Sequence, residues 1–239
     1  MKHLSTLVLA IFAALLLSTP AKADVAGQIN VGPCAAGSVT ITATTIDFTL
    51  PVGGGNGCIQ TGIGTNITYT GGGPLTAGVT GLVQDLTVGG GTVLNFMTFV
   101  GNPSLHFDLT VLGPGLNNTV CAAVLDPNLP GCSIVAGSPF ILLPTLSATA
   151  LSLSVSGVAR DASGNSSTWT GLFTTQIPGV TPASIQSTLL GGGSITGGSY
   201  SGSFTVTASQ VPEPATILLL GTGLAGIVFK VRKGRRQAV

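Results

Sequence analysis

The sequence predicts an all-β body, an antiparallel two-sheet sandwich or jelly-roll-like fold, with an N-terminal signal helix and a C-terminal transmembrane helix. Apolar residues alternate with Thr and Ser in runs such as SVTITATTIDFTL and GSYSGSFTVTA. Glycine-rich turns separate these runs at intervals of roughly 8–12 residues. No segment before residue 215 shows a convincing helical period. Such alternation is typical of antiparallel strands with one solvated face. A β-solenoid is the alternative, but the runs have no fixed repeat.

The charge is distributed unevenly along the 239 residues, of which only 6% are charged. Between residues 24 and 211 the only basic residue is Arg160, against aspartates at 24, 47, 85, 108, 126 and 161. One positive and six negative charges give this region a net charge of about −5. Because a nucleic-acid binder needs a basic face, the sequence predicts no nucleic-acid partner.

The first 23 residues have the layout of a secretory signal peptide. Lys2 precedes an apolar run over 7–17, and Ala21-Lys22-Ala23 follows a proline break. Eleven apolar residues are too few to cross a ~30 Å hydrocarbon core, and A-x-A is a typical cleavage site. We therefore expect export by the Sec machinery and a mature chain that starts at Asp24.

A second apolar run near the C-terminus predicts a transmembrane helix over 215–231. Its first fifteen residues, at ~1.5 Å per residue, barely span the core. Five basic residues place its far end in the cytoplasm by the positive-inside rule: Lys230, Arg232, Lys233, Arg235 and Arg236. The run contains GTGLAG at 221–226, a match to the dinucleotide fingerprint. Basic rather than acidic residues follow it, so we expect no nucleotide site and no cofactor.

A proline motif lies directly before this run. Pro212 and Pro214 flank Glu213 and favour an extended backbone. The motif at 211–215, the apolar run and the basic tail at 230–239 together resemble the PEP-CTERM sorting signal of Gram-negative surface proteins. The resemblance covers residues 211–239. It implies that a membrane-embedded exosortase recognises Pro212, Glu213 and Pro214 and removes the tail. The alternative is a permanent single-pass anchor with a proline stalk.

The resemblance also implies a location and a role. The precursor would be anchored in the inner membrane with its C-terminus in the cytoplasm, and would then pass to the outer surface or extracellular matrix. The chain divides into a signal peptide (1–23), an exported β-sandwich domain (24–210) and the sorting signal (211–239). Body segments such as FDLT and SPFILLP also resemble those of PEP-CTERM proteins, whose bodies mostly lack an assigned activity. The family resemblance suggests a non-enzymatic structural or adhesive role in exopolysaccharide or biofilm. A carbohydrate-binding module and a secreted hydrolase are the alternatives.

Four cysteines lie in the exported region: Cys34, Cys58, Cys121 and Cys132. An even number in an oxidising compartment predicts two disulfides, and four cysteines allow three pairings. We favour Cys34–Cys58 and Cys121–Cys132 because each pair is local in the sequence. The chain has no C-x-x-C and the body has only one histidine, so we expect no zinc site.

Three sets of residues are candidates for chemistry or binding. Ser104, His106 and Asp108 share one face of a predicted strand, but neighbours on a face project in parallel ~6.5–7 Å apart, so we expect a solvated face rather than a triad. The segment 161–167 offers oxygen ligands at Asp161, Ser163 and Asn165, but lacks the Gly and Glu of a calcium loop, so we expect a hairpin turn. The candidate sugar platforms are Trp169, Tyr69 and Tyr200, although a single tryptophan is more often a core residue.

Overall fold

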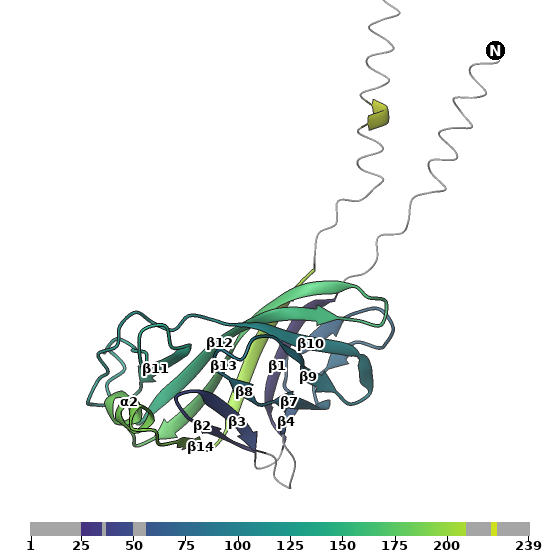
Figure 1. Ribbon diagram of the computed structural model, residues 1–239. Coiled ribbons are helices and arrows are strands. Elements are labelled where there is room, and N and C mark those ends of the chain that lie inside the picture. Colours follow the sequence, from purple (N-terminus) through teal and green to yellow (C-terminus); the bar gives the residue numbers. More distant parts are fainter. Residues whose placement is uncertain (1–24, 35–36, 50–55, 209–220, 224–239) are drawn as a thin grey trace, which may run out of the picture. The chain divides into compact units, whose positions relative to one another are not determined.

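The computed structural model describes residues 25–34, 37–49, 56–208 and 221–223 (Figure 1). Antiparallel strands dominate the described residues, which confirms the predicted all-β class. The elements are β1 (Ala26–Pro33), β2 (Ser38–Ile41), β3 (Thr45–Thr49), β4 (Asn56–Thr61), β5 (Asn66–Thr68), β6 (Leu75–Thr76), β7 (Thr80–Gln84), β8 (Leu86–Thr87), β9 (Val93–Phe99), β10 (Asn102–Leu112), β11 (Phe140–Pro144), β12 (Ala148–Arg160), β13 (Ser166–Pro178), α2 (Pro182–Leu190), β14 (Ile195–Gly197) and β15 (Tyr200–Thr207).

The main sheet closes on itself. Its closed, barrel-like part has eight strands in the order β15-β13-β12-β10-β9-β7-β4-β1, and β1 pairs again with β15. At this seam Ile29 lies opposite Phe204 and Gly27 opposite Val206. The short strands β5 and β6 extend the sheet beyond β1, and β11 pairs with β12. The predicted two-sheet sandwich is therefore not confirmed. Closure gives each of the eight strands a partner on both sides and removes exposed edges.

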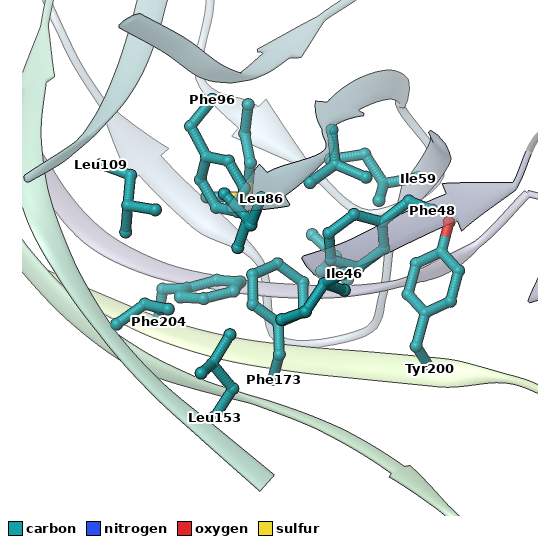
Figure 2. Close-up of a cluster of buried hydrophobic side chains, with 14 of the residues drawn as sticks. Ile46, Phe48, Ile59, Leu86, Phe96, Leu109, Leu153, Phe173, Tyr200 and Phe204 are labelled. Carbon is teal, nitrogen blue, oxygen red and sulfur yellow. The ribbon is translucent and has the colours of Figure 1, made fainter. Parts of the chain in front are cut away.

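A smaller sheet, in the order β14-β2-β3-β8, packs against the main sheet. Figure 2 shows Ile46 and Phe48 of β3 facing Phe173 and Leu153, and the rings of Phe48 and Phe173 are 5.5 Å apart. The run 38–50, which looks like one alternating segment in the sequence, turns back as the β2–β3 hairpin. In this turn the Thr45 N–H donates to Thr42 Oγ1 at 2.9 Å.

The interior of the closed sheet is filled by aromatic rings that lie opposite glycines on neighbouring strands. The cross-strand pairs are Trp169–Gly157, Phe204–Gly171, Phe173–Gly202 and Phe99–Gly81. A methyl group at residue 157 would lie 2.8 Å from Trp169 Nε1 and would overlap Asp108 O. An eight-stranded barrel is just wide enough for side chains to fill, and glycine lets strands bend sharply. These pairs therefore help to fill the interior, because each glycine leaves room for the ring on the neighbouring strand.

One helix lies where the sequence predicted none. In α2 the Thr181 side chain caps the first turn by accepting a hydrogen bond from Ser184 N at 3.3 Å, and Pro182 takes the first helical position. Ile185 and Leu189 are buried. The missed signal is the Thr-Pro pair, a typical helix start. Nine residues are too short for a clear 3.6-residue period, which explains the wrong prediction.

We predict that Gly157→Ala lowers the free energy of unfolding by about 1–3 kcal/mol, because the added methyl group overpacks the core against Trp169 and Asp108. Urea unfolding of the oxidised protein, followed by the fluorescence of Trp169, measures the change. Gly73→Ala is the matched control, since its Cβ would have no atom within 4 Å. Equal stability of the two variants would contradict this account of the core.

Candidate functional site

The predicted sorting and signal residues lie outside the described residues. This applies to Ala21, Ala23 and Asp24, to the motif Pro212-Glu213-Pro214, and to the basic residues Lys230, Arg232, Lys233, Arg235 and Arg236. Of the predicted transmembrane segment, only 221–223 is described, as helix. Within the described ranges, no helix combines the length and apolar character that a membrane crossing requires.

Strand β10 carries the three residues considered as a triad. Leu105, Phe107 and Leu109 point into the core, as the alternation predicts. The other face is not simply solvated, because Asp108 is only 2% exposed. The expectation of a solvated strand face is therefore wrong for this carboxylate. Burial of a charge requires partners, and these determine what Asp108 can do.

Asp108 is held by three elements of the closed sheet. Its carboxylate forms an ion pair with Arg160 of β12 and accepts the Asn95 N–H at 2.7 Å. Its backbone carbonyl accepts the Trp169 indole N–H at 3.1 Å. Asn95 reaches it from a left-handed backbone conformation with φ of 54°, which asparagine tolerates. Arg160 and Asn95, rather than His106, orient the carboxylate, so Ser104, His106 and Asp108 do not form a catalytic relay.

Asp161 organises the β12–β13 hairpin turn, which confirms the predicted turn. Its carboxylate accepts the backbone N–H groups of Ser163 at 2.9 Å, Asn165 at 3.1 Å and Thr70 at 3.0 Å. Burial raises the pKa of Asp161, but the hydrogen bonds from Asn165, Thr70 and Ser163 outweigh it, and the net shift is downward. Because N–H donors occupy both oxygens, this turn does not fit the alternative of a calcium loop. The described residues also contain no cluster of three or more His, Cys, Asp or Glu suited to a metal.

The aromatic side chains considered as sugar platforms are core residues. Trp169 is 1% exposed, Tyr200 4% and Tyr69 9%. The Tyr69 hydroxyl donates to Asn102 Oδ1 at 2.5 Å, and the Tyr200 hydroxyl donates to Cys58 O at 2.7 Å. Across the described part of the chain, every aromatic side chain is buried. The core position expected for the single tryptophan is therefore confirmed, and the alternative of an exposed sugar platform at Trp169, Tyr69 or Tyr200 is not supported.

Both disulfides favoured from the sequence are present, Cys34–Cys58 and Cys121–Cys132. The first links the end of β1 to β4, close to Tyr200. The second closes the loop at 121–132. Helix α2 packs beside this loop and donates hydrogen bonds to the segments on either side of it. Gln186 Nε2 donates to Thr119 O at 2.9 Å and to Ile134 O at 2.8 Å. This contact could not be predicted from the sequence, because the helix that carries Gln186 was not predicted.

Two of the hollows among the described residues bear on ligand binding. One of ≈ 20 Å³ is lined by core residues between β2–β3 and β12–β13, and could hold about one water molecule. The other, of ≈ 250 Å³, is bordered by Ala43, Val88, Ile134, Val135 and Leu190. Ligand pockets usually combine apolar walls with a few convergent polar groups. Ser138 is the one polar side chain that borders the second hollow.

The comparison with protein families finds one match, at the C-terminal end. Residues 210–236 match the PEP-CTERM protein-sorting motif. This chain carries a PEP-CTERM sorting motif. The match contains Pro212, Glu213, Pro214 and all five basic residues of the tail. The motif implies export, a membrane-anchored precursor and processing by an exosortase. The comparisons with curated proteins and with solved structures found no match.

The two tyrosines give a prediction for alkaline pH. Burial raises the pKa of Tyr200 to about 12, and burial also raises the pKa of Tyr69 above 10.0, although Ser104 partly opposes it. Tyr69 and Tyr200 are the only tyrosines of the chain. A raised folded-state pKa contributes stability that is complete below pH 10 and is lost as pH rises toward 12. At pH 10 we therefore expect clearly less tyrosinate absorbance in the folded protein than in urea.

The measurement is an ultraviolet titration of the folded and the urea-unfolded protein. Tyr200→Phe should remove the step near pH 12 and leave the Tyr69 step. Half-ionised tyrosine at pH 10 in the folded protein would contradict the burial of both hydroxyls.

Proposed function

We propose that this protein is an exported precursor whose tail is removed by an exosortase, and whose β body then serves as a non-enzymatic structural or adhesive element of an exopolysaccharide matrix. The observation that carries the proposal is the sorting motif at residues 210–236. The predicted signal peptide at 1–23 agrees with it, because it would deliver the body to the side of the membrane where such motifs are processed. Two disulfides suit the same oxidising compartment.

The boundaries of the body support processing at both ends. Strand β1 begins at Ala26, three residues after Ala23, and β15 ends at Thr207, before the motif match begins at residue 210. Removal of the signal peptide and of the tail would therefore leave every strand of the closed sheet intact. Because β1 pairs with β15, both ends of the body leave it from the same seam.

The uses of the aspartates support a non-enzymatic body. Asp108 is paired with Arg160, and Asp161 holds a turn. Asp85 accepts the Phe48 N–H at 2.8 Å, and Asp126 accepts the Asn128 N–H at 2.9 Å. Each of these carboxylates stabilises a backbone segment. The hydrolase alternative consequently loses its candidate triad, and the binding-module alternative loses its aromatic platform.

The test is the intact mass of the protein recovered from the cell surface. The wild-type protein should lack residues 1–23 and the tail that follows the motif. Pro212→Ala and Glu213→Ala should keep the tail and accumulate in the inner membrane, because they alter the extended recognition segment. Pro130→Ala, an exposed proline of the disulfide loop, is the matched control and should be processed like the wild type. An unprocessed wild-type protein in the inner membrane would overturn the proposal.

A further inference from the structure

One wall of the closed sheet presents hydroxyl and amide groups on its outer side. The wall consists of the adjacent strands β13, β15, β1 and β5, of which β13 and β1 are labelled in Figure 1. On these strands the inward positions hold core residues, and the outward positions are mostly Thr, Ser, Gln and Asn. Six of these outward residues form what we call the hydroxyl–amide face: Thr170, Thr205, Ser203, Gln28, Asn30 and Asn66.

Strand register aligns these residues in rows. Thr170 lies opposite Thr205, and Thr205 lies opposite Gln28. Gln28 in turn lies opposite Asn66, so one polar row crosses four strands. Neighbouring strands are ~4.8 Å apart, so the row repeats polar groups at that spacing. In the next row Ser203 lies opposite Asn30. All six residues except the half-buried Asn30 are exposed.

Hydrogen bonds within the face fix several of its polar groups. Ser203 Oγ donates to Asn30 Oδ1 at 2.8 Å, and Asn30 Nδ2 donates to the carbonyl of Ile63 at 2.9 Å. The Gln28 N–H donates to Asn66 Oδ1 at 3.1 Å. Side chains that are ordered before binding lose less conformational entropy when a ligand binds. The side chains of Ser203, Asn30 and Asn66 are therefore arranged before a ligand binds.

The chemistry of the face selects the class of ligand. None of its six side chains is ionisable, so a charged polymer would lose solvation there without gaining a countercharge. A neutral polyhydroxylated polymer can exchange hydrogen bonds with hydroxyls and amides. Leu172, which is 42% exposed and lies opposite Ser203, adds an apolar contact suited to the C–H groups of a sugar ring.

We propose that the hydroxyl–amide face binds a neutral polysaccharide laid across β13, β15, β1 and β5. The inference rests on the proposed function, a surface protein of a polysaccharide matrix, and names the surface and the ligand class. It requires no aromatic platform. The proposed binding surface includes β1 and β15, the two strands that pair at the seam.

The test measures binding isotherms of the detergent-solubilised full chain. The probes are three neutral polysaccharides, cellulose, chitin and dextran, with alginate as the anionic comparison. We expect at least one neutral probe to bind, and Thr170→Lys and Thr205→Lys each to weaken that binding about tenfold or more, because a charge on the face must be desolvated. The matched control is Thr87→Lys, an exposed threonine of β8 in the other sheet, which should bind within about twofold of the wild type.

Three outcomes would overturn the proposal: no binding to any neutral probe, stronger binding to alginate, or neutral binding that both face variants leave unchanged. Cell fractionation separates this result from the proposed function. If the protein is processed and reaches the matrix but binds no neutral polysaccharide, only the proposal for the hydroxyl–amide face is overturned. Face-dependent binding by a protein that is never exported or processed would instead overturn the proposed function.

Discussion

The pairing of the first strand with the last is the constraint on which the rest of the structure depends. Strands β1 and β15 are separated by almost the whole body in the sequence, yet they pair from Gly27–Val206 to Val31–Gly202. This seam turns an open sheet into a closed one and gives the interior a fixed width. That width is filled by rings that lie over glycines, such as Phe204 over Gly171. The seam, the glycines and the aromatic residues therefore depend on one another: the seam sets the width, and the rings packed over glycines fill it.

Closure also decides where function can lie. The interior is filled in part by the buried side chains of Trp169, Tyr69 and Tyr200, so a ligand at the surface cannot contact them. The carboxylates of Asp108 and Asp161 hold neighbouring segments together. The surface that we propose for recognition is the outer wall, where polar groups stand in rows, and the sorting motif lies in the tail. The sorting signal and the polar outer surface thus lie in separate parts of the chain.

The sequence predicted local features well and long-range ones poorly. Alternation identified β15, and local spacing identified both disulfides. It could not show closure, because the partner of each strand depends on contacts far apart in the sequence. The role of Asp108 could not be predicted either, since its partners Arg160 and Asn95 lie on two other strands. The short helix α2 was missed, although Thr181 and Pro182 carry its start signal. The tail was recognisable because its motif is read linearly.

Hydrogen exchange across the seam tests the central claim most directly. The amides of β1 and β15 that pair at the seam should exchange as slowly as those that pair β12 with β13, because both belong to one closed, cooperative unit. The measurement follows individual amides in the native, oxidised protein. Seam amides that exchange orders of magnitude faster than the β12–β13 amides would contradict a closed sheet and indicate an open one.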